Sequence, residues 1–414
     1  MMFKFNHKYL LPLILFAALA WADDFVVEKE SNGVYEVYFE KNYQLGDDLE
    51  LYVDDYEGDI IISGRYGNSM SIRENCRINT YSEQDARSKY YQSKVGFILN
   101  ENRLEINGNR RSSKINSTLE LIVPDFTKIR LDARSSDVSI KGVDGDINLL
   151  ARDCDIDLTN VSSKVKINGK SSDVIILDCA MIGDLKLSRG YLSINGLESE
   201  YFNATLFGAS LDADGLDSRV VFKTTGGDIL IKESRNDAKL YASGGDIVVE
   251  KIYGNIACNT KGGSITIDEV QGLCKVDCIA GDVIIDNAMD NLNINAVKSD
   301  IEIEEAARSV YIESSNADIE LGKKVLENDD KILIKNRVGD ITLYLDEDIN
   351  AELVARIEYR DDFDWDIDSD FELDRLKTER SGRKGYISKK GRLNSGGGTI
   401  ILHNKSGDIY INKN

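Results

Sequence analysis

Proline is almost absent from this chain of 414 residues, which contains only Pro12 and Pro124. Because proline has no backbone N–H to donate, a chain built from continuous β ladders has few places for it. Histidine is equally scarce, and only His403 follows the first 22 residues. A Ser/His/Asp triad is therefore not expected, and the sequence shows no glycine-rich phosphate loop or metal motif. These absences argue against an enzyme.

Positive charge is also in deficit, since 51 Lys and Arg stand against 72 Asp and Glu and give a net charge of −21. Residues 1–22 contain Lys4 and Lys8 and no acidic residue, so the remainder carries −23. Such a chain is not expected to bind nucleic acid or an anionic membrane surface. Its field favours cationic partners.

The N-terminus is predicted to be an export signal. Lys4 and Lys8 precede the apolar run YLLPLILFAALA, which is too short for an ordinary transmembrane helix. Ala20-Trp21-Ala22 has the pattern of a cleavage site. The alternative is a buried N-terminal helix. We expect an exported protein, periplasmic or extracellular and on the cell surface, without membrane insertion once the signal is removed.

The rest of the sequence is dominated by a repeat with a period of 18 residues. The spacing changes to 19 after Tyr191 and to 22 after Asp318. The coil starts are Asp137, Asp155, Asp173, Tyr191, Ser210, Asp228, Asp246, Ser264, Asp282, Asp300, Asp318 and Asp340. A fixed period near 20 residues is typical of a solenoid, in which each coil stacks on the next.

Apolar residues recur at positions 1, 3, 6, 10 and 12 after each coil start. A spacing of two is the period of a strand with one buried face, and the wider gaps mark corners. Five buried side chains contribute about 8–15 kcal/mol, whereas ordering 18 residues costs about 27 kcal/mol. A coil alone is therefore unstable. We predict an all-β, single-stranded β-helix (a β-solenoid) with coils of about 18 residues.

The corners of the coils have their own pattern. The residue before each coil start is small, as at Gly245, Ser172 and Ala317. Since Ser and Ala occur where Gly does, we expect small size to be the shared requirement there. The Asp that follows is expected to bond its own backbone in an Asx-turn.

The chain is predicted to divide into four parts. These are a signal peptide at 1–22, a β-rich entry and capping region at 23–130, the regular solenoid at 131–345, and a C-terminal solenoid region at 346–414. The last part includes an acidic insertion and a closing repeat.

Two details of these flanking parts can be predicted. In the entry region, Asp59 begins an isolated early copy of the repeat, and Ser82 followed by Asp85 predicts a helix that ends near Lys94. In residues 361–374 acidic and apolar residues alternate, which predicts a strand with one apolar face. That face would consist of Phe363, Trp365, Ile367, Phe371 and Leu373.

Three segments carry a family resemblance: LELIVPDFTKIRLDARSSDVSI, ITLYLDEDINAELVA and GGGTIILHNKSGDIYINK. Together with the coils from Asp137 to Asp340, they resemble the bacterial putative-adhesin family, a domain of unknown function with Gly-Asp-Ile repeats. The resemblance covers roughly residues 45–414. It implies a right-handed β-helix-like solenoid and supplies no functional residues.

An acidic column is the one candidate for a metal site. Its members lie four residues after successive coil starts: Glu250, Asp268, Asp286 and Glu304. Stacked carboxylates repel by about 0.9 kcal/mol per pair in water, and bound Ca²⁺ would relieve that repulsion. The alternative is a solvated outer face. No catalytic residue or cofactor is predicted.

The cysteines leave a second question open. Cys258 and Cys274 occupy neighbouring inward positions on adjacent coils, so a disulfide is conceivable. The alternative, which we favour, is that they are small core residues. Cys274 and Cys278 have no partner pair or histidine nearby, which argues against zinc.

The sequence therefore predicts an exported, non-catalytic β-solenoid that acts as an adhesin or as a surface or envelope binding protein. Its ligand would be a protein or a carbohydrate. One alternative is a regulatory or scaffold protein inside the envelope that binds cationic partners. Another is a polysaccharide-active β-helix enzyme, although Trp365 is the only tryptophan after residue 22 and there is little sign of an aromatic sugar-binding groove.

Overall fold

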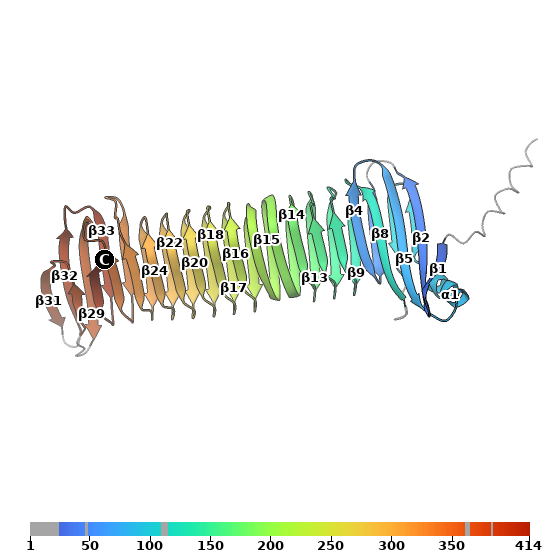
Figure 1. Cartoon of the computed structure of the whole chain (residues 1–414). Coiled ribbons are helices and arrows are strands. Elements are labelled where there is room, and N and C mark those ends of the chain that lie inside the picture. The colour runs from blue at the N-terminus through green and yellow to red at the C-terminus, as the bar shows by residue number, and fades with distance from the viewer. Residues whose placement is uncertain (1–24, 46–48, 109–114, 361–364, 382–383) are drawn as a thin grey trace, which may run out of the picture.

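The computed structural model describes residues 25–45, 49–108, 115–360, 365–381 and 384–414. The predicted signal peptide and Phe363 lie outside these ranges. The described residues form a straight rod of stacked β coils with an antiparallel cap at each end (Figure 1). The predicted all-β solenoid is confirmed. Its handedness stays a prediction.

Each coil contributes one strand to each of two parallel ladders, which we call ladder A and ladder B. Ladder A contains β10 (Val138–Lys141), β12 (Ile156–Thr159), β14 (Val174–Cys179), β16 (Ile229–Ser234), β18 (Ile247–Ile252), β20 (Ile265–Val270), β22 (Val283–Ala288), β24 (Ile301–Ala306), β26 (Ile319–Lys323) and β28 (Ile341–Leu345). Ladder B contains β9 (Lys128–Arg134), β11 (Ile147–Arg152), β13 (Lys164–Lys170), β17 (Ala238–Ser243), β19 (Ile256–Lys261), β21 (Cys274–Ile279), β23 (Leu292–Val297), β25 (Val310–Ser315) and β27 (Lys331–Asn336). The long strand β15 (Ile182–Thr225) runs through both ladders.

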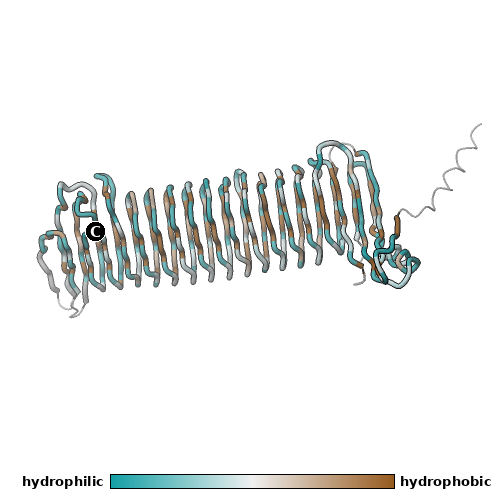
Figure 2. The backbone as a smooth tube through the Cα atoms, viewed as in Figure 1, coloured by the Kyte–Doolittle hydropathy of each residue, from teal (hydrophilic) through white to brown (hydrophobic). Residues whose placement is uncertain are grey.

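The core lies between the ladders, and all five predicted inward positions are buried. In the coil that starts at Asp246 these are Ile247, Val249, Ile252, Ile256 and Cys258. Apolar and polar residues alternate along every coil, as Figure 2 shows. The prediction omitted a sixth inward position, 14 residues after the coil start. It holds Ala242, Thr260, Cys278, Ala296 and Ser314.

The corners of the coils differ from the prediction in two respects. The positive φ falls two residues before the coil start, at Gly244 (79°) and Asn316 (77°), so the αL residue precedes the small one. The coil-start Asp does not form the predicted Asx-turn. Instead Asp246 Oδ1 accepts a hydrogen bond from the backbone N–H of Ser264, at 2.7 Å, in the next coil. The Asp side chains therefore connect neighbouring coils.

The N-terminal end is capped by an antiparallel layer and one helix. Strands β3 (Glu50–Tyr56) and β4 (Asp59–Arg65) form a coil below β9 and β10, which confirms Asp59 as an early copy of the repeat. The remaining elements are β1 (Phe25–Ser31), β2 (Val34–Gln44), β5 (Ser69–Asn79), α1 (Glu83–Ser93), β6 (Gly96–Asn100), β7 (Arg103–Asn107) and β8 (Ile115–Pro124). The predicted helix is confirmed, since Ser82 Oγ accepts from the Asp85 N–H at 3.2 Å.

At the C-terminal end the coils do not follow chain order. Strands β33 (Gly398–Asn404) and β34 (Ile409–Lys413) lie between the preceding coil, β27 and β28, and an outer coil made by β29 (Ala351–Arg360) and β30 (Ile367–Ser369). Asp408 accordingly donates its N–H to Asp340 and accepts from Asp366. The antiparallel strands β31 (Asp374–Ser381) and β32 (Lys384–Leu393) cover the outer coil (Figure 1).

The structure modifies two further predictions. Residues 365–374 do not form one continuous strand, because only Ile367–Ser369 is extended before β31 begins. Ile367 is buried, and Trp365, Phe371 and Leu373 pack partly against the core.

All six cysteines are buried free thiols. Cys258 pairs with Val276 and Cys274 with Ile256. The two thiols are thus two residues out of register, a diagonal separation of about 7–8 Å that a disulfide cannot span without backbone movement.

Candidate binding faces

The outer face of ladder A is acidic. Leaving β15 aside, its strands carry eleven carboxylates, which are Asp157, Asp178, Glu233, Glu250, Asp268, Glu269, Asp286, Glu302, Glu304, Glu305 and Glu320. Against these stand three lysines that reach solvent, Lys141, Lys232 and Lys251. We call this surface the acidic face.

The outer face of ladder B has the opposite charge. Its strands carry twelve basic residues, which are Lys128, Arg130, Arg134, Arg152, Lys164, Lys166, Lys170, Lys239, Lys261, Lys275, Lys331 and Lys335. They carry only three acidic residues, Asp132, Asp277 and Glu313. We call this surface the basic face. The net charge of −21 conceals it.

The two faces also differ in how their lysines are paired. On the acidic face, Lys232 lies 3.3 Å from Asp212 and Lys251 lies 3.1 Å from Glu269. The Asp212 carboxylate, as hydrogen-bond acceptor and as neighbouring charge, raises the pKa of Lys232. On the basic face, by contrast, no described residue forms an ion pair with Lys239, Lys261, Lys331 or Lys335, a set chosen from the strands between β17 and β27. The positive charge of this face is therefore largely uncompensated.

Three hollows lie on the basic face. One, of about 390 Å³, lies over the first strands of ladder B and is lined by Lys128, Arg130, Lys164, Lys166 and Tyr52, with Glu50, Asp146 and Asp184 among its acidic residues. Arg103 stacks on the Tyr52 ring at 3.8 Å from its centroid.

The other two hollows lie next to each other across β23, β25 and β27, and we call them the paired hollows. The first, of about 350 Å³, is lined by Lys275, Lys331, Asn291, Asn293, Tyr311 and Leu333, among others. The second, of about 580 Å³, is lined by Lys335, Arg337, Lys405, His403, Asn295 and Glu313, among others. Cations, amides and one tyrosine thus converge there, with a single carboxylate.

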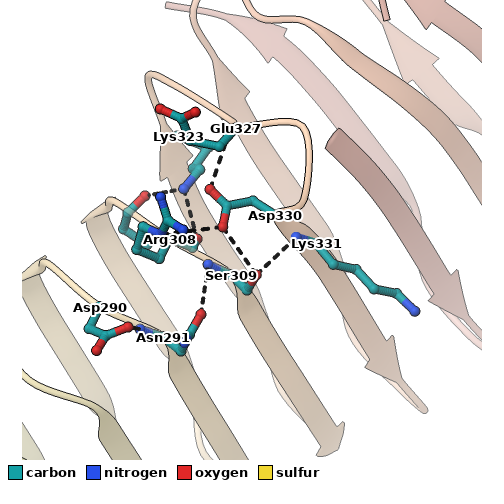
Figure 3. A network of polar contacts seen from close by, with 9 residues as sticks. Asp290, Asn291, Arg308, Ser309, Lys323, Glu327, Asp330 and Lys331 are labelled. Atoms are coloured by element: carbon teal, nitrogen blue, oxygen red, sulfur yellow. Dashed lines mark hydrogen bonds and ion pairs between the residues drawn. The ribbon is translucent and has the colours of Figure 1, made fainter. Parts of the chain in front are cut away.

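A buried polar network supports the edge of the first paired hollow (Figure 3). Lys323 is fully buried, and its Nζ donates to the carbonyl oxygens of Ala306, at 2.6 Å, and Arg308, at 2.8 Å. Burial lowers the pKa of Lys323 to about 8, although Asp330 opposes the shift. Asp330 is also buried and pairs with Arg308 at 3.5 Å.

This network belongs to the coil whose spacing is 22 residues. Ser309 Oγ donates to Asp330 Oδ1 at 3.3 Å and accepts from the Lys331 N–H at 3.0 Å, so the lengthened corner is held against the strand that follows. Because Lys323 and Asp330 are both committed to internal partners, we interpret them as structural rather than catalytic. The sequence gave no signal for this network except the irregular spacing.

The candidate calcium column lies on the acidic face. Glu250, Asp268 and Glu304 are exposed and Asp286 is half-buried. Among the residues that the structure describes, no group of three or more His, Cys, Asp or Glu side chains is arranged to hold a metal ion. The column is thus part of a solvated charged face in this structure. No helix in the described ranges is long and apolar enough to span a membrane.

Comparisons with known proteins agree with this fold. Residues 232–412 match the family described as Toastrack DUF4097. A putative adhesin from Parabacteroides merdae is 12% identical, with 58% of this chain and 95% of that chain covered and a TM-score of 0.40. A putative adhesin from Parabacteroides distasonis is also 12% identical, with coverage of 58% and 96% and a TM-score of 0.33.

A putative cell adhesion protein from Clostridium sporogenes is 9% identical, with 91% of this chain and 100% of that chain covered and a TM-score of 0.16. No curated protein matches the chain. The family match begins later than residue 45, where the resemblance in the sequence begins, but it identifies the same family. The chain therefore carries a Toastrack DUF4097 domain at residues 232–412, a domain of a family of unknown function that was suspected from the Gly-Asp-Ile repeats.

Proposed function

We propose that this protein is an exported, non-catalytic binding protein of the adhesin type, which presents its solenoid surface to a ligand outside the cell. The observation that carries the proposal is the position of the hollows. All three that are described above lie on the basic face, where the cations are largely unpaired. Concave sites with a few convergent polar groups are where ligands usually bind.

The test has two parts, because export and display are separate steps. The mature protein should begin at Asp23, as N-terminal sequencing of the purified protein would show. Protease added to intact producing cells should digest it. If it is protected until the envelope is opened, display on the surface is excluded.

A second candidate function follows from the acidic face. A scaffold or regulatory protein inside the envelope could bind cationic partners there, since eleven carboxylates stand against three lysines. That protein would be protected in intact cells and would retain basic partners in a salt-sensitive pull-down.

Catalysis would overturn both candidates. Release of reducing ends or of unsaturated products from a panel of polysaccharides would identify an enzyme instead.

A further inference from the structure

We propose that the paired hollows on the basic face bind a linear polysaccharide that carries carboxylate groups. This inference rests on the proposed function only in placing a ligand on ladder B. It adds the chemical class of the ligand and the residues that would contact it.

The first argument is charge. Lys331 and Lys335 project from the same strand, β27, and neither forms an ion pair with a described residue. Lys275 shares its charge with Asp277 at 3.6 Å. Ladder strands repeat about every 4.8 Å along the rod, so cations on successive coils form a row that suits a chain with regularly spaced negative charges. A single small anion would use only a part of that row.

The second argument is the chemistry between the cations. Asn293 and Asn295 lie on β23 and each presents an amide that can donate to and accept from sugar hydroxyls. Tyr311 and Leu333 add apolar surface for a sugar ring to pack on. The Tyr311 hydroxyl donates to Glu313 at 2.7 Å, and Lys335 lies 5.8 Å from the ring centroid. The aromatic ring is thereby held in one orientation on the face.

The third argument separates this ligand from other polyanions. Lysine, a point charge without the planar fork of arginine, supplies most of the positive charge at these hollows. A protein with a net charge of −21 repels a densely charged nucleic acid at long range. A carboxylated polysaccharide has one charge per sugar at most in its simplest form, and its uncharged hydroxyl groups match the amides.

The experiment uses the full mature chain and polygalacturonate, with neutral dextran, single-stranded DNA and a second copy of the chain as comparisons. Affinity is measured by co-sedimentation or calorimetry at low ionic strength. Binding to polygalacturonate should be tighter than to DNA and absent for dextran. It should weaken strongly at about 1 M salt, where the Debye length is about 3 Å.

The decisive variants change charge on one face at a time. Lys331→Glu with Lys335→Glu should weaken binding at least about tenfold, because two attractions become repulsions. Lys141→Glu with Lys251→Glu makes the same change in net charge on the acidic face and should alter affinity by less than about twofold. All four side chains point outward, and circular dichroism would confirm that both variants fold.

Several results would overturn the inference. Equal loss in both variants would mean that net charge alone governs binding, and equal affinity for DNA would remove the assignment to a polysaccharide. Salt-sensitive self-association that only the basic-face variant abolishes would make this face an interface between copies. None of these results would affect the test of export and display, so the two proposals can fail separately.

Discussion

The two faces of each coil share one interior and differ in everything outside it. Inward residues on both ladders are alike, with Ile231 and Ile267 on ladder A corresponding to Leu240 and Ile294 on ladder B, all fully buried. Outward residues have been sorted by charge, carboxylates on ladder A and lysines on ladder B. The interior determines the stacking of the coils, and the exterior is free to vary without affecting it. The difference between the faces is therefore where we look for function.

The largest expected effect tests whether the interior is truly shared. Leu240→Ala on ladder B and Ile267→Ala on ladder A should each lower the free energy of unfolding by about 2–5 kcal/mol, because both leave a cavity in one continuous core. The outward changes Lys239→Ala and Asp268→Ala should stay within about 0.5 kcal/mol. Denaturant titration measures all four. A large effect on one ladder alone would contradict a shared interior.

The next effect concerns Lys323, which separates the irregular coil from the regular ones. Its pKa is about 8 in the folded chain and about 10.4 when unfolded. Between these values the unfolded state binds more protons, so the free energy of unfolding should rise with pH. Relative to Lys323→Met, the wild type should gain up to about 3 kcal/mol from pH 7 to pH 10.5.

Stability curves at several pH values would measure this difference between wild type and variant. A difference that does not change with pH would show that Lys323 is not buried as a cation. Other titrating groups are common to both proteins and cancel.

A smaller effect tests the bonds between coils at the corner next to ladder A. Asp246→Ala removes the acceptor for the Ser264 N–H and should cost about 1 kcal/mol. Asp268→Ala is the matched control, since that exposed carboxylate accepts no hydrogen bond from a described residue. Thermal unfolding compares them. If Asp246→Ala costs no more than its control, the coil-start Asp is not a link between coils.

The smallest effect concerns the surface ion pairs. Lys251→Ala on the acidic face removes the pair with Glu269 and should cost about 0.5 kcal/mol at low salt and almost nothing at high salt. Lys261→Ala on the basic face removes no ion pair and should be neutral or slightly stabilising. A larger cost for Lys261→Ala would contradict the contrast between paired and unpaired lysines.

The regular part of the fold could be predicted because its signal is local and repeated. Positions 1, 3, 6, 10 and 12 keep the same apolar character through many coils, and Ser82 with Asp85 indicated the helix cap. The sixth inward position was missed because Thr260 and Ser314 are polar there, although their backbone places them inside. The Asx-turn prediction failed because a sequence does not show whether Asp246 bonds to its own coil or to the next one.

The ends of the rod were harder to predict because they depend on long-range order. Asp408 is the last repeat in the sequence, yet its coil lies between those of Asp340 and Asp366. Spacing along the chain carries no information about such an insertion. The basic face, by contrast, was visible in principle in the residues of ladder B. It was missed because charge was considered for the whole chain.

The most direct test of the account is lysine footprinting with and without polygalacturonate. Mass spectrometry after reductive methylation would report each lysine separately. The account predicts protection of Lys275, Lys331 and Lys335, with Lys141 and Lys251 unchanged. Equal protection on both faces, or protection of the acidic face alone, would contradict the claim that ladder B is the binding surface.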